Sequence, residues 1–247
     1  MEAASRPSMN FVPIKQVQQQ DIQSIHRVRS RVVKNRTALI NEIRGLGLEY
    51  GIAIAPGAAK VKRCLSEIIA NSKNELTELS RECMRGLYEE LIEIEARQKK
   101  LDKQIHQISK QSETCNRILK IPGVGDLTAT AIVAAIPDAK AFKNGRHMAA
   151  WLGLVPRQSS SGDKHILLGI SKRGDRYLRT LLIHGARSAL SHYKHTDSLY
   201  GRWLFEKKAS LSFNKAAVAL ANKNARIIWS LLNTGAEFNS NTKLVAA

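Results

Sequence analysis

The sequence predicts a mainly α-helical protein with a long antiparallel coiled-coil arm, followed by a compact helical domain that contains a helix-hairpin-helix element. Three observations support this fold class. Only 5% of the 247 residues are aromatic, and the abundance of Ala, Leu, Ile, Lys and Arg favours helices. Apolar residues recur at helical spacing over two long stretches. A glycine-containing turn, Pro122–Gly125, separates two short apolar helical segments. The length allows one large domain or two small ones.

The first long helix is expected at residues 17–50. Its apolar stripe consists of Ile22, Ile25, Val28, Val32, Leu39, Ile43 and Leu46. The other faces carry Arg27, Arg29, Arg31, Lys34, Arg36 and Arg44, and the acidic residues lie toward the two ends. The basic middle of the helix is therefore a candidate nucleic-acid surface, although a solvated helix face also carries such charges.

The second helical region is expected at residues 58–112. Its later part keeps a heptad seam made of Leu87, Leu91, Ile94, Leu101, Ile105 and Ile108, with Gln98 as a polar interruption. The two helices are expected to pair either within the chain or between protomers, so a homo-oligomer joined through the arm is one expectation. The expected organisation is a tail at 1–15, the arm at 16–113, a compact domain at 114–235 and a disordered tail at 236–247.

The turn Pro122–Gly125 is expected between helices at 114–120 and 127–136. Two glycines permit a tight turn with positive φ and close approach of a partner to the backbone. The free N–H groups and positive dipole end at the start of the second helix favour an anion. Gly123, Val124 and Gly125 are therefore candidates for phosphate binding. The alternative is a helical hairpin with a glycine turn and no ligand.

The formal net charge is +18. Such an excess favours a polyanionic partner, most plausibly nucleic acid, although a ribosomal or membrane-surface role gives a similar balance. Between residues 140 and 226 there are 17 Lys and Arg against four acids. Asp175 is expected to cap a helix at 175–190. The candidate phosphate-binding cations near it are Lys164, Lys172, Arg173, Arg176 and Arg179.

No metal site is expected in this chain. The three cysteines, Cys64, Cys83 and Cys115, lie far apart and have no zinc-type spacing with the histidines. No run of acids could hold paired Mg²⁺ ions. No segment resembles a signal peptide or is long and apolar enough to span a bilayer, so a cytoplasmic protein with no membrane partner is expected.

The polar segment 157–169 is expected to be a loop, with a short hairpin as an option, and it contains a candidate reactive serine. Ser159–Lys164 reads Ser-Ser-Ser-Gly-Asp-Lys. A serine beside glycine presents its hydroxyl freely, but it becomes a nucleophile only when a base or metal removes its proton. A flexible Ser/Gly loop without chemistry is the more common structure for such a sequence.

Several motifs in order along the chain carry a family resemblance. They are Ile121–Gly125, Trp151–Pro156, Ser160–Gly162 with Lys164, Gly169–Arg179, Leu182–Arg187 and Ala216–Trp229, preceded by Phe11–Lys15 and Arg36–Arg44. The sequence resembles the Piv/MooV-type transposases of the insertion sequence one-ten family over essentially its whole length. The resemblance implies DNA transposition, with Ser161 as the nucleophile that holds DNA covalently and Ser160 as the fallback. It also implies a RuvC-like domain whose DEDD carboxylates bind Mg²⁺ and, in some members, a guide RNA encoded by the element.

The resemblance departs from the family at the start of the chain. The first carboxylates of the RuvC-like domain have no counterpart, since Met1 falls where that domain is ending. A truncated or split transposase without bound metal is therefore expected, with doubtful catalysis by this chain alone. The alternatives are a non-catalytic nucleic-acid-binding remnant and a helix-hairpin-helix DNA-binding module.

Overall fold

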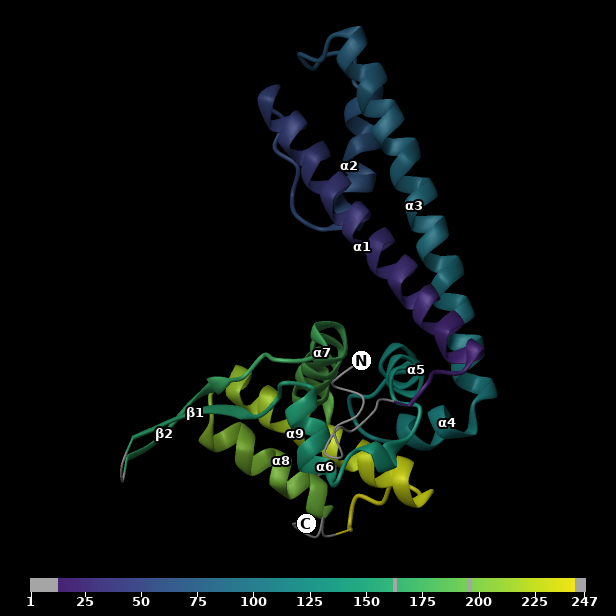
Figure 1. Ribbon diagram of the computed structural model, residues 1–247. Helices are drawn as coiled ribbons and strands as arrows, with labels where there is room; N and C mark the ends of the chain where they lie inside the picture. The colour runs from purple at the N-terminus through teal and green to yellow at the C-terminus, as the bar shows by residue number, and fades with distance from the viewer. Residues whose placement is uncertain (1–12, 162–163, 195–196, 243–247) are drawn as a thin grey trace. The chain divides into compact units, whose positions relative to one another are not determined.

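The computed structural model describes residues 13–161, 164–194 and 197–242, and within these ranges it confirms a mainly helical protein (Figure 1). The chain divides into two compact units, described here separately: the arm, residues 24–104, and the main unit, residues 1–23 with 105–247. The elements are α1 (Val17–Glu49), α2 (Ala58–Ala70), α3 (Glu78–Gln111), α4 (Glu113–Leu119), α5 (Asp126–Ala135), the 3₁₀ turn η2 (Ala139–Ala141), α6 (Gly145–Trp151), β1 (Pro156–Ser161), β2 (Lys164–Ile170), α7 (Arg176–His192), α8 (Leu199–Ser210) and α9 (Phe213–Thr234).

In the arm, α1 and α3 lie antiparallel within one chain. Arg29 pairs with Asp102, and Arg36 pairs with Glu95 at 2.8 Å. Moving forward along α1 therefore moves the ion-pair partner backward along α3, as antiparallel helices require. The sequence left open whether the two helices pair within the chain or between protomers, and the structure pairs them within the chain. These bonds also occupy two of the arginines that were expected to form a nucleic-acid surface.

The arm contains a third helix that the sequence analysis merged with α3. The expected region 58–112 breaks between α2 and α3, and Arg81 holds the break. Its guanidinium donates to the carbonyls of Ile69 and Asn71, both at 2.9 Å, and to Leu76 at 3.2 Å. These bonds satisfy carbonyls left free at the end of a helix. The three helices enclose a common core whose buried members are Leu39, Ile43, Ile54, Val61, Leu65, Met84 and Leu91.

The core of the main unit is built around α9. This helix packs against α6, α7 and α8, and its alanines at 216, 217, 221 and 225 are buried. Small side chains let the neighbouring helices approach closely. Larger side chains fill the rest of the core, and the fully buried ones include Ile118, Ile121, Ile132, Met148, Leu152, Leu178 and Leu182.

A buried polar network fixes the glycine-containing turn to this core. The amide of Asn224 on α9 donates to the carbonyl of Pro122 at 2.9 Å, and the hydroxyl of Tyr200 on α8 donates to Asn224 at 2.9 Å. Burial raises the pKa of the Tyr200 hydroxyl. The hydroxyl therefore stays protonated and acts as a donor. The network joins three segments that lie far apart in the sequence.

The start of α7 matches the sequence-based expectation, and the segment after α9 differs from it. Asp175 caps α7 as expected, because its carboxylate accepts from the N–H groups of Tyr177 at 2.7 Å and Leu178 at 3.0 Å. The segment 236–242, expected to be disordered, is instead tethered: the N–H of Tyr200 donates to the Ser240 carbonyl at 2.9 Å. Residues 243–247 lie outside the described part, as do residues 1–12 of the expected N-terminal tail. No described helix is long and apolar enough to cross a membrane.

Candidate nucleic-acid interface and reactive serine

The serine-containing segment forms a two-stranded antiparallel ribbon of β1 and β2, which is the hairpin option of the sequence analysis. In its register Ser161 lies opposite Lys164, and Ser159 lies opposite Ile166. Gly162 and Asp163, which connect the strands, lie outside the described residues. The candidate nucleophile Ser161 is therefore the last residue of β1, and Lys164 is placed across from it by the backbone.

The three serines of the ribbon are all exposed but do not share one face. Side chains alternate along a strand, so Ser159 and Ser161 lie on one face and Ser160 lies on the other. A DNA strand approaching one face can therefore meet Ser161 or Ser160, but not both equally. The structure makes these two candidates separable by experiment.

The second strand of the ribbon, β2, exposes apolar side chains. Ile166, Leu167 and Leu168 are 53%, 69% and 45% exposed. Ile166 and Leu168 share one face of the ribbon and Leu167 lies on the other, because side chains alternate along a strand. An isolated two-stranded ribbon is only marginally stable in water, and this one exposes apolar side chains on both faces. We expect the ribbon to be stabilised by contact with another molecule.

A rigid basic loop joins the ribbon to α7. The N–H of Ser171 donates to the Val155 carbonyl at 2.8 Å, and the N–H of Lys172 donates to the Gly153 carbonyl at 3.2 Å. Gly174 has φ +94°, and a Cβ there would lie 1.8 Å from the Trp151 carbonyl oxygen. Close packing of backbone on backbone therefore fixes the loop.

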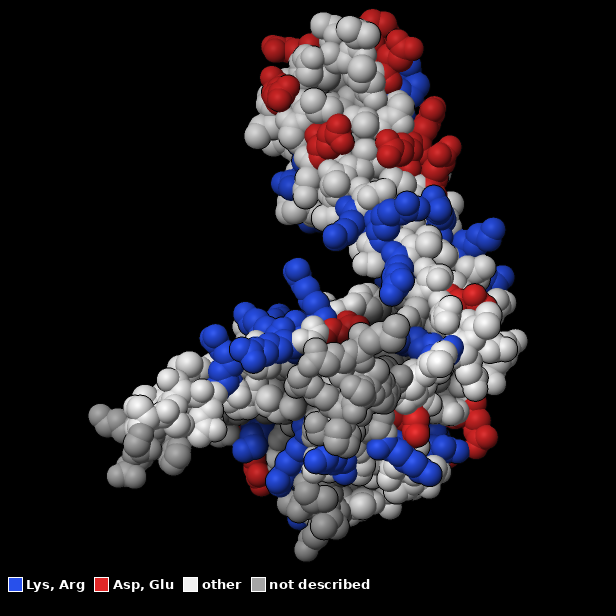
Figure 2. Space-filling model, in the orientation of Figure 1, with Lys and Arg blue, Asp and Glu red and all other residues white. Residues whose placement is uncertain are grey.

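The fixed loop presents positive charge beside the ribbon. Arg157, Lys172, Arg173 and Arg176 are all exposed, and Figure 2 shows Lys and Arg side chains gathered where the ribbon joins the main unit. We call these four residues the basic cluster. Its rigid backbone and exposed cations suit contacts with a phosphate backbone.

Arg179 does not belong to this surface, which corrects the sequence-based expectation. It is only 8% exposed, and its guanidinium donates to the Leu152 carbonyl at 3.0 Å and the Arg173 carbonyl at 3.4 Å. Arg179 therefore ties the end of α6 to the basic loop. It positions Arg173 and does not reach the solvent-exposed surface itself.

The glycine-containing turn is also more enclosed than the sequence indicated. Gly123 has φ +87°, as expected, but a Cβ there would lie 2.5 Å from the carbonyl oxygen of Gly185 on α7. The Val124 side chain is buried, and its N–H donates to the Ile121 carbonyl at 3.0 Å. Gly123 and Val124 thus contribute packing. Gly125, exposed at the start of α5, is the part of the turn that a phosphate can reach.

A carboxylate already lies at the positive end of α5. Asp126 is the first residue of this helix, and its Oδ2 lies 2.8 Å from the Nδ1 of His106. Partial burial acts to raise the pKa of Asp126. The interactions with His106, together with Ser109 and the charge of Lys110, outweigh it and hold the pKa below its usual value. Since this negative charge interacts with the helix dipole itself, it weakens attraction of a phosphate to the same place.

Among residues 13–161, 164–194 and 197–242, no three His, Cys, Asp or Glu side chains lie close enough to hold a metal ion. The Mg²⁺ implied by the family resemblance therefore has no fitting ligand set in the described part of this chain. The cysteines Cys64, Cys83 and Cys115 are free thiols.

Comparisons with known proteins match this region to a family. The family model described as Transposase IS116/IS110/IS902 family matches residues 115–201, which contain the glycine-containing turn, the ribbon and α7. The chain is 48% identical over 231 residues to the transposase for insertion sequence element IS1111A of Coxiella burnetii, covering 94% of this chain and 64% of that protein.

Two further relatives agree. A probable family 20 transposase of Pseudomonas aeruginosa is 48% identical over 233 residues, covering 94% of this chain and 69% of the relative. The transposase for insertion sequence element IS1328 of Yersinia enterocolitica is 34% identical over 238 residues, covering 96% of this chain and 70% of the relative. The chain therefore belongs to the IS116/IS110/IS902 family of insertion-sequence transposases, which confirms the resemblance read from the motifs. It spans about two thirds of the length of these relatives.

Proposed function

We propose that this chain acts in the DNA transposition of an insertion sequence, with the basic cluster binding the DNA backbone and Ser161 reacting with it. The observation that carries the proposal is the placement of an exposed serine at the end of β1 on a ribbon whose other end adjoins exposed Arg and Lys side chains. Both lie within the residues matched by the transposase family model.

The proposed chemistry is a transesterification at phosphorus. The Oγ of Ser161 attacks a phosphodiester, an Oγ–P bond forms, and the bond between phosphorus and one deoxyribose oxygen breaks. The serine loses its proton, the departing sugar hydroxyl gains one, and the phosphate remains esterified to the protein. Phosphoryl transfer is accelerated by positive charge at the equatorial oxygens. The basic cluster adjoins the opposite end of the ribbon from Ser161, so its role in the proposal is to bind the DNA backbone further along the strand. A second DNA hydroxyl then reverses the step on a new strand.

The remaining parts of the transposition machinery are also proposals. The RuvC-like carboxylates that bind Mg²⁺ would be supplied by the intact family architecture, and no step here passes through that metal. A guide RNA would be a further basic-surface partner. Assembly of a homo-oligomer through the arm is supported by the exposed Leu48, Leu79 and Ile92 on α1 and α3.

Exchanging Arg173 and Arg176 for glutamine should weaken DNA binding. Each lost phosphate contact lowers the slope of log affinity against log salt concentration by about 1, so the double variant should show a slope smaller by about 2. Fluorescence anisotropy with a labelled duplex, repeated from low to physiological salt, measures this slope. The exposed Lys140 and Lys143, exchanged for glutamine together, remove the same charge elsewhere on the main unit and serve as the matched control. Equal losses in both double variants would mean that no specific cluster binds DNA.

Ser161→Ala should abolish strand transfer while leaving DNA affinity unchanged. Removal of an attacking nucleophile lowers the rate by about 10³-fold or more. The assay supplies the variant chain with an intact RuvC-like partner and scores joined DNA products. Ser159→Ala is the control, because Ser159 lies two residues before Ser161 on the same face of β1. Unchanged transfer by Ser161→Ala would exclude Ser161 as the nucleophile. If Ser160→Ala also left transfer unchanged, this chain would be a nucleic-acid-binding protein without chemistry of its own, which is the alternative function.

A further inference from the structure

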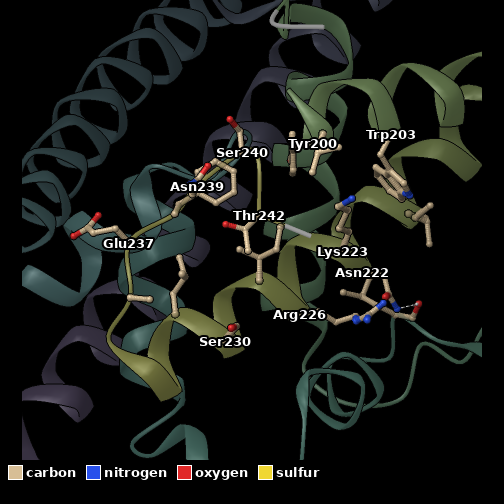
Figure 3. A pocket seen from close by; sticks show the side chains of 18 of the residues that line it. Tyr200, Trp203, Asn222, Lys223, Arg226, Ser230, Glu237, Asn239, Ser240 and Thr242 are labelled. Carbon is tan, nitrogen blue, oxygen red and sulfur yellow. Dashed lines mark hydrogen bonds between the residues drawn. The ribbon is translucent and has the colours of Figure 1, made fainter. Parts of the chain in front are cut away.

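A cavity of about 930 Å³ opens in the main unit between α8, α9 and the tethered segment 236–242 (Figure 3). The base of the ribbon contributes to it: Pro156 at the start of β1 and Ile170 at the end of β2 line its wall. The proposed DNA chemistry does not use this cavity. It nevertheless lies where the ribbon that carries Ser161 enters the main unit.

Aromatic rings and tight tethers form one part of the wall. Tyr200, Trp203 and Phe238 line the cavity, and the rings of Tyr200 and Phe238 meet edge to face with centroids 5.7 Å apart. The segment that carries Phe238 is held by the bond from the Tyr200 N–H to Ser240 and by a bond of 3.2 Å from the Leu199 N–H to Asn241. The aromatic wall is therefore preorganised.

Cations without acidic partners form another part of the wall. Lys215, Lys223 and Arg226 line the cavity from α9, and within the described ranges no carboxylate forms an ion pair with any of them. The acid in the lining, Glu237, is engaged with Lys120 at 2.5 Å. The cavity therefore has an excess of positive charge that an anion would balance.

The ammonium of Lys223 is half-buried against aromatic rings. Its Nζ lies 4.0 Å from the centroid of the Trp203 ring and 5.6 Å from that of Tyr200. Burial, with a smaller effect of Arg226 and of Lys207 and opposition from Glu206, lowers the pKa of Lys223 to about 8. A half-buried ammonium that lies against aromatic faces and has two cations nearby gains from a bound anion.

We propose that this cavity binds one unpaired nucleotide of a nucleic acid, with the base against the aromatic wall and the phosphate at Lys223 and Arg226. The inference extends the proposed function and rests on nucleic acid being the partner. A nucleotide joins a planar base to an anionic phosphate, so the base matches the aromatic part of the wall and the phosphate matches the cationic part. Proteins bind unpaired strands by stacking aromatic side chains on the bases and placing cations at the backbone. The cavity volume lies in the range of small-molecule sites and exceeds the size of a phosphate ion.

An unpaired nucleotide in this place would serve strand exchange. Exchange requires strands to leave their duplex. A site at the base of the ribbon would hold a displaced nucleotide several positions along the strand from the one at Ser161, because Pro156 and Ser161 lie at opposite ends of β1. The stacking recovers part of the free energy lost on unstacking the base.

Titration of deoxyadenosine 5′-monophosphate into the full chain tests the site directly, with the indole N–H signal of Trp203 followed by NMR. We expect saturable binding that shifts this signal. Isothermal titration calorimetry compares the variants, because the Trp203 variants lack the indole signal. Lys223→Met and Trp203→Leu should weaken binding at least about tenfold, whereas Lys223→Arg and Trp203→Phe, which keep the charge and a ring, should retain most of it. Phe205→Leu, an exposed change on α8, is the control. Adenosine 5′-monophosphate in parallel tells whether the site prefers DNA or RNA.

The pH dependence gives a second readout. Between pH 7 and 9 the free Lys223 loses its charge as the pH passes about 8, so nucleotide affinity should fall in this window. A bound phosphate raises the pKa of Lys223, and binding near pH 8 should therefore take up a proton. Lys223→Met should remove both effects. The other charged or titratable groups around Lys223 are Lys215, Arg226, Glu206, Lys207, Tyr200 and Glu237.

The outcomes separate this inference from the proposed function. The Arg173/Arg176 double variant should bind the mononucleotide normally while losing duplex affinity. No saturable mononucleotide binding, or equal affinity for inorganic phosphate, overturns the nucleotide site and leaves the basic cluster unaffected. If the wild-type chain bound the mononucleotide but did not bind duplex DNA, the proposed function alone would be contradicted.

Discussion

Gly185→Ala is expected to unfold the main unit or to reduce its stability severely. Gly185 lies in the middle of α7, and a Cβ there would be placed 1.8 Å from the carbonyl oxygen of Gly123. Backbone meets backbone at this point, so no flexible side chain can move aside. Overpacking of this kind costs about 3 kcal/mol of unfolding free energy or more. That is a large fraction of the stability of a typical domain.

Chemical denaturation of the full chain measures this effect, with hydrogen exchange in α5 and α7 identifying which unit opens. Gly123→Ala should behave similarly, because it adds the strain of φ +87° to a contact of 2.5 Å with Gly185. Gly125→Ala is the control, since nothing lies within 4 Å of its Cβ position and its φ is −107°. If Gly185→Ala unfolds at the same denaturant concentration as the wild type, the packing of the turn against α7 is wrong.

Arg179→Met is the second change with a large expected effect. It keeps most of the side-chain volume but removes the donors to the carbonyls of Leu152 and Arg173, which a buried guanidinium satisfies. Hydrogen bonds from a charged group contribute about 1.5–3 kcal/mol each, and an unsatisfied buried carbonyl adds a penalty. We expect a loss of about 3 kcal/mol in stability, accompanied by greater mobility of the basic loop.

Arg176→Met is the matched comparison, because Arg176 lies one turn earlier on the same helix and is exposed. It should leave the unfolding midpoint unchanged and weaken DNA binding. Arg179→Met should lower the unfolding midpoint. At temperatures where it remains folded, it should weaken DNA binding without changing the slope of log affinity against log salt concentration, because it loosens the basic loop but removes no phosphate contact. A stable Arg179→Met protein with a reduced slope would restore the sequence-based assignment of Arg179 to the interface.

The periodicity of apolar residues was sufficient to predict the helices but not the contacts that end them. The stripes of α1 and α3 and the cap at Asp175 follow from local patterns, whereas the ribbon was only one option for a segment expected to be a loop. The break between α2 and α3 does not, because Arg81 stabilises it by reaching back to carbonyls five to thirteen residues earlier. A local pattern cannot show such a tertiary contact.

The candidate site was predicted in part. The exposed cations Lys172, Arg173 and Arg176 follow from composition and spacing. Arg179 was misplaced, although its spacing from Leu182 and Ala186 puts it on the buried face of α7 and could have revealed this. The orientation of the turn at Gly123 depends on Gly185, sixty-two residues later. The cavity at Lys223 depends on five segments, which are the start of β1, the end of β2, α8, α9 and residues 236–242. Neither can be read from local sequence.

The site of covalent attachment to DNA tests the account most directly. A DNA substrate with sulfur in place of the bridging leaving oxygen would trap the adduct, because a thiol returns poorly to the phosphate. After incubation of the chain with this substrate and an intact RuvC-like partner, digestion and mass spectrometry of residues 158–164 would locate the nucleotide. We predict attachment at Ser161. Attachment at Ser160 or another residue, or strand transfer without any adduct, would contradict the account.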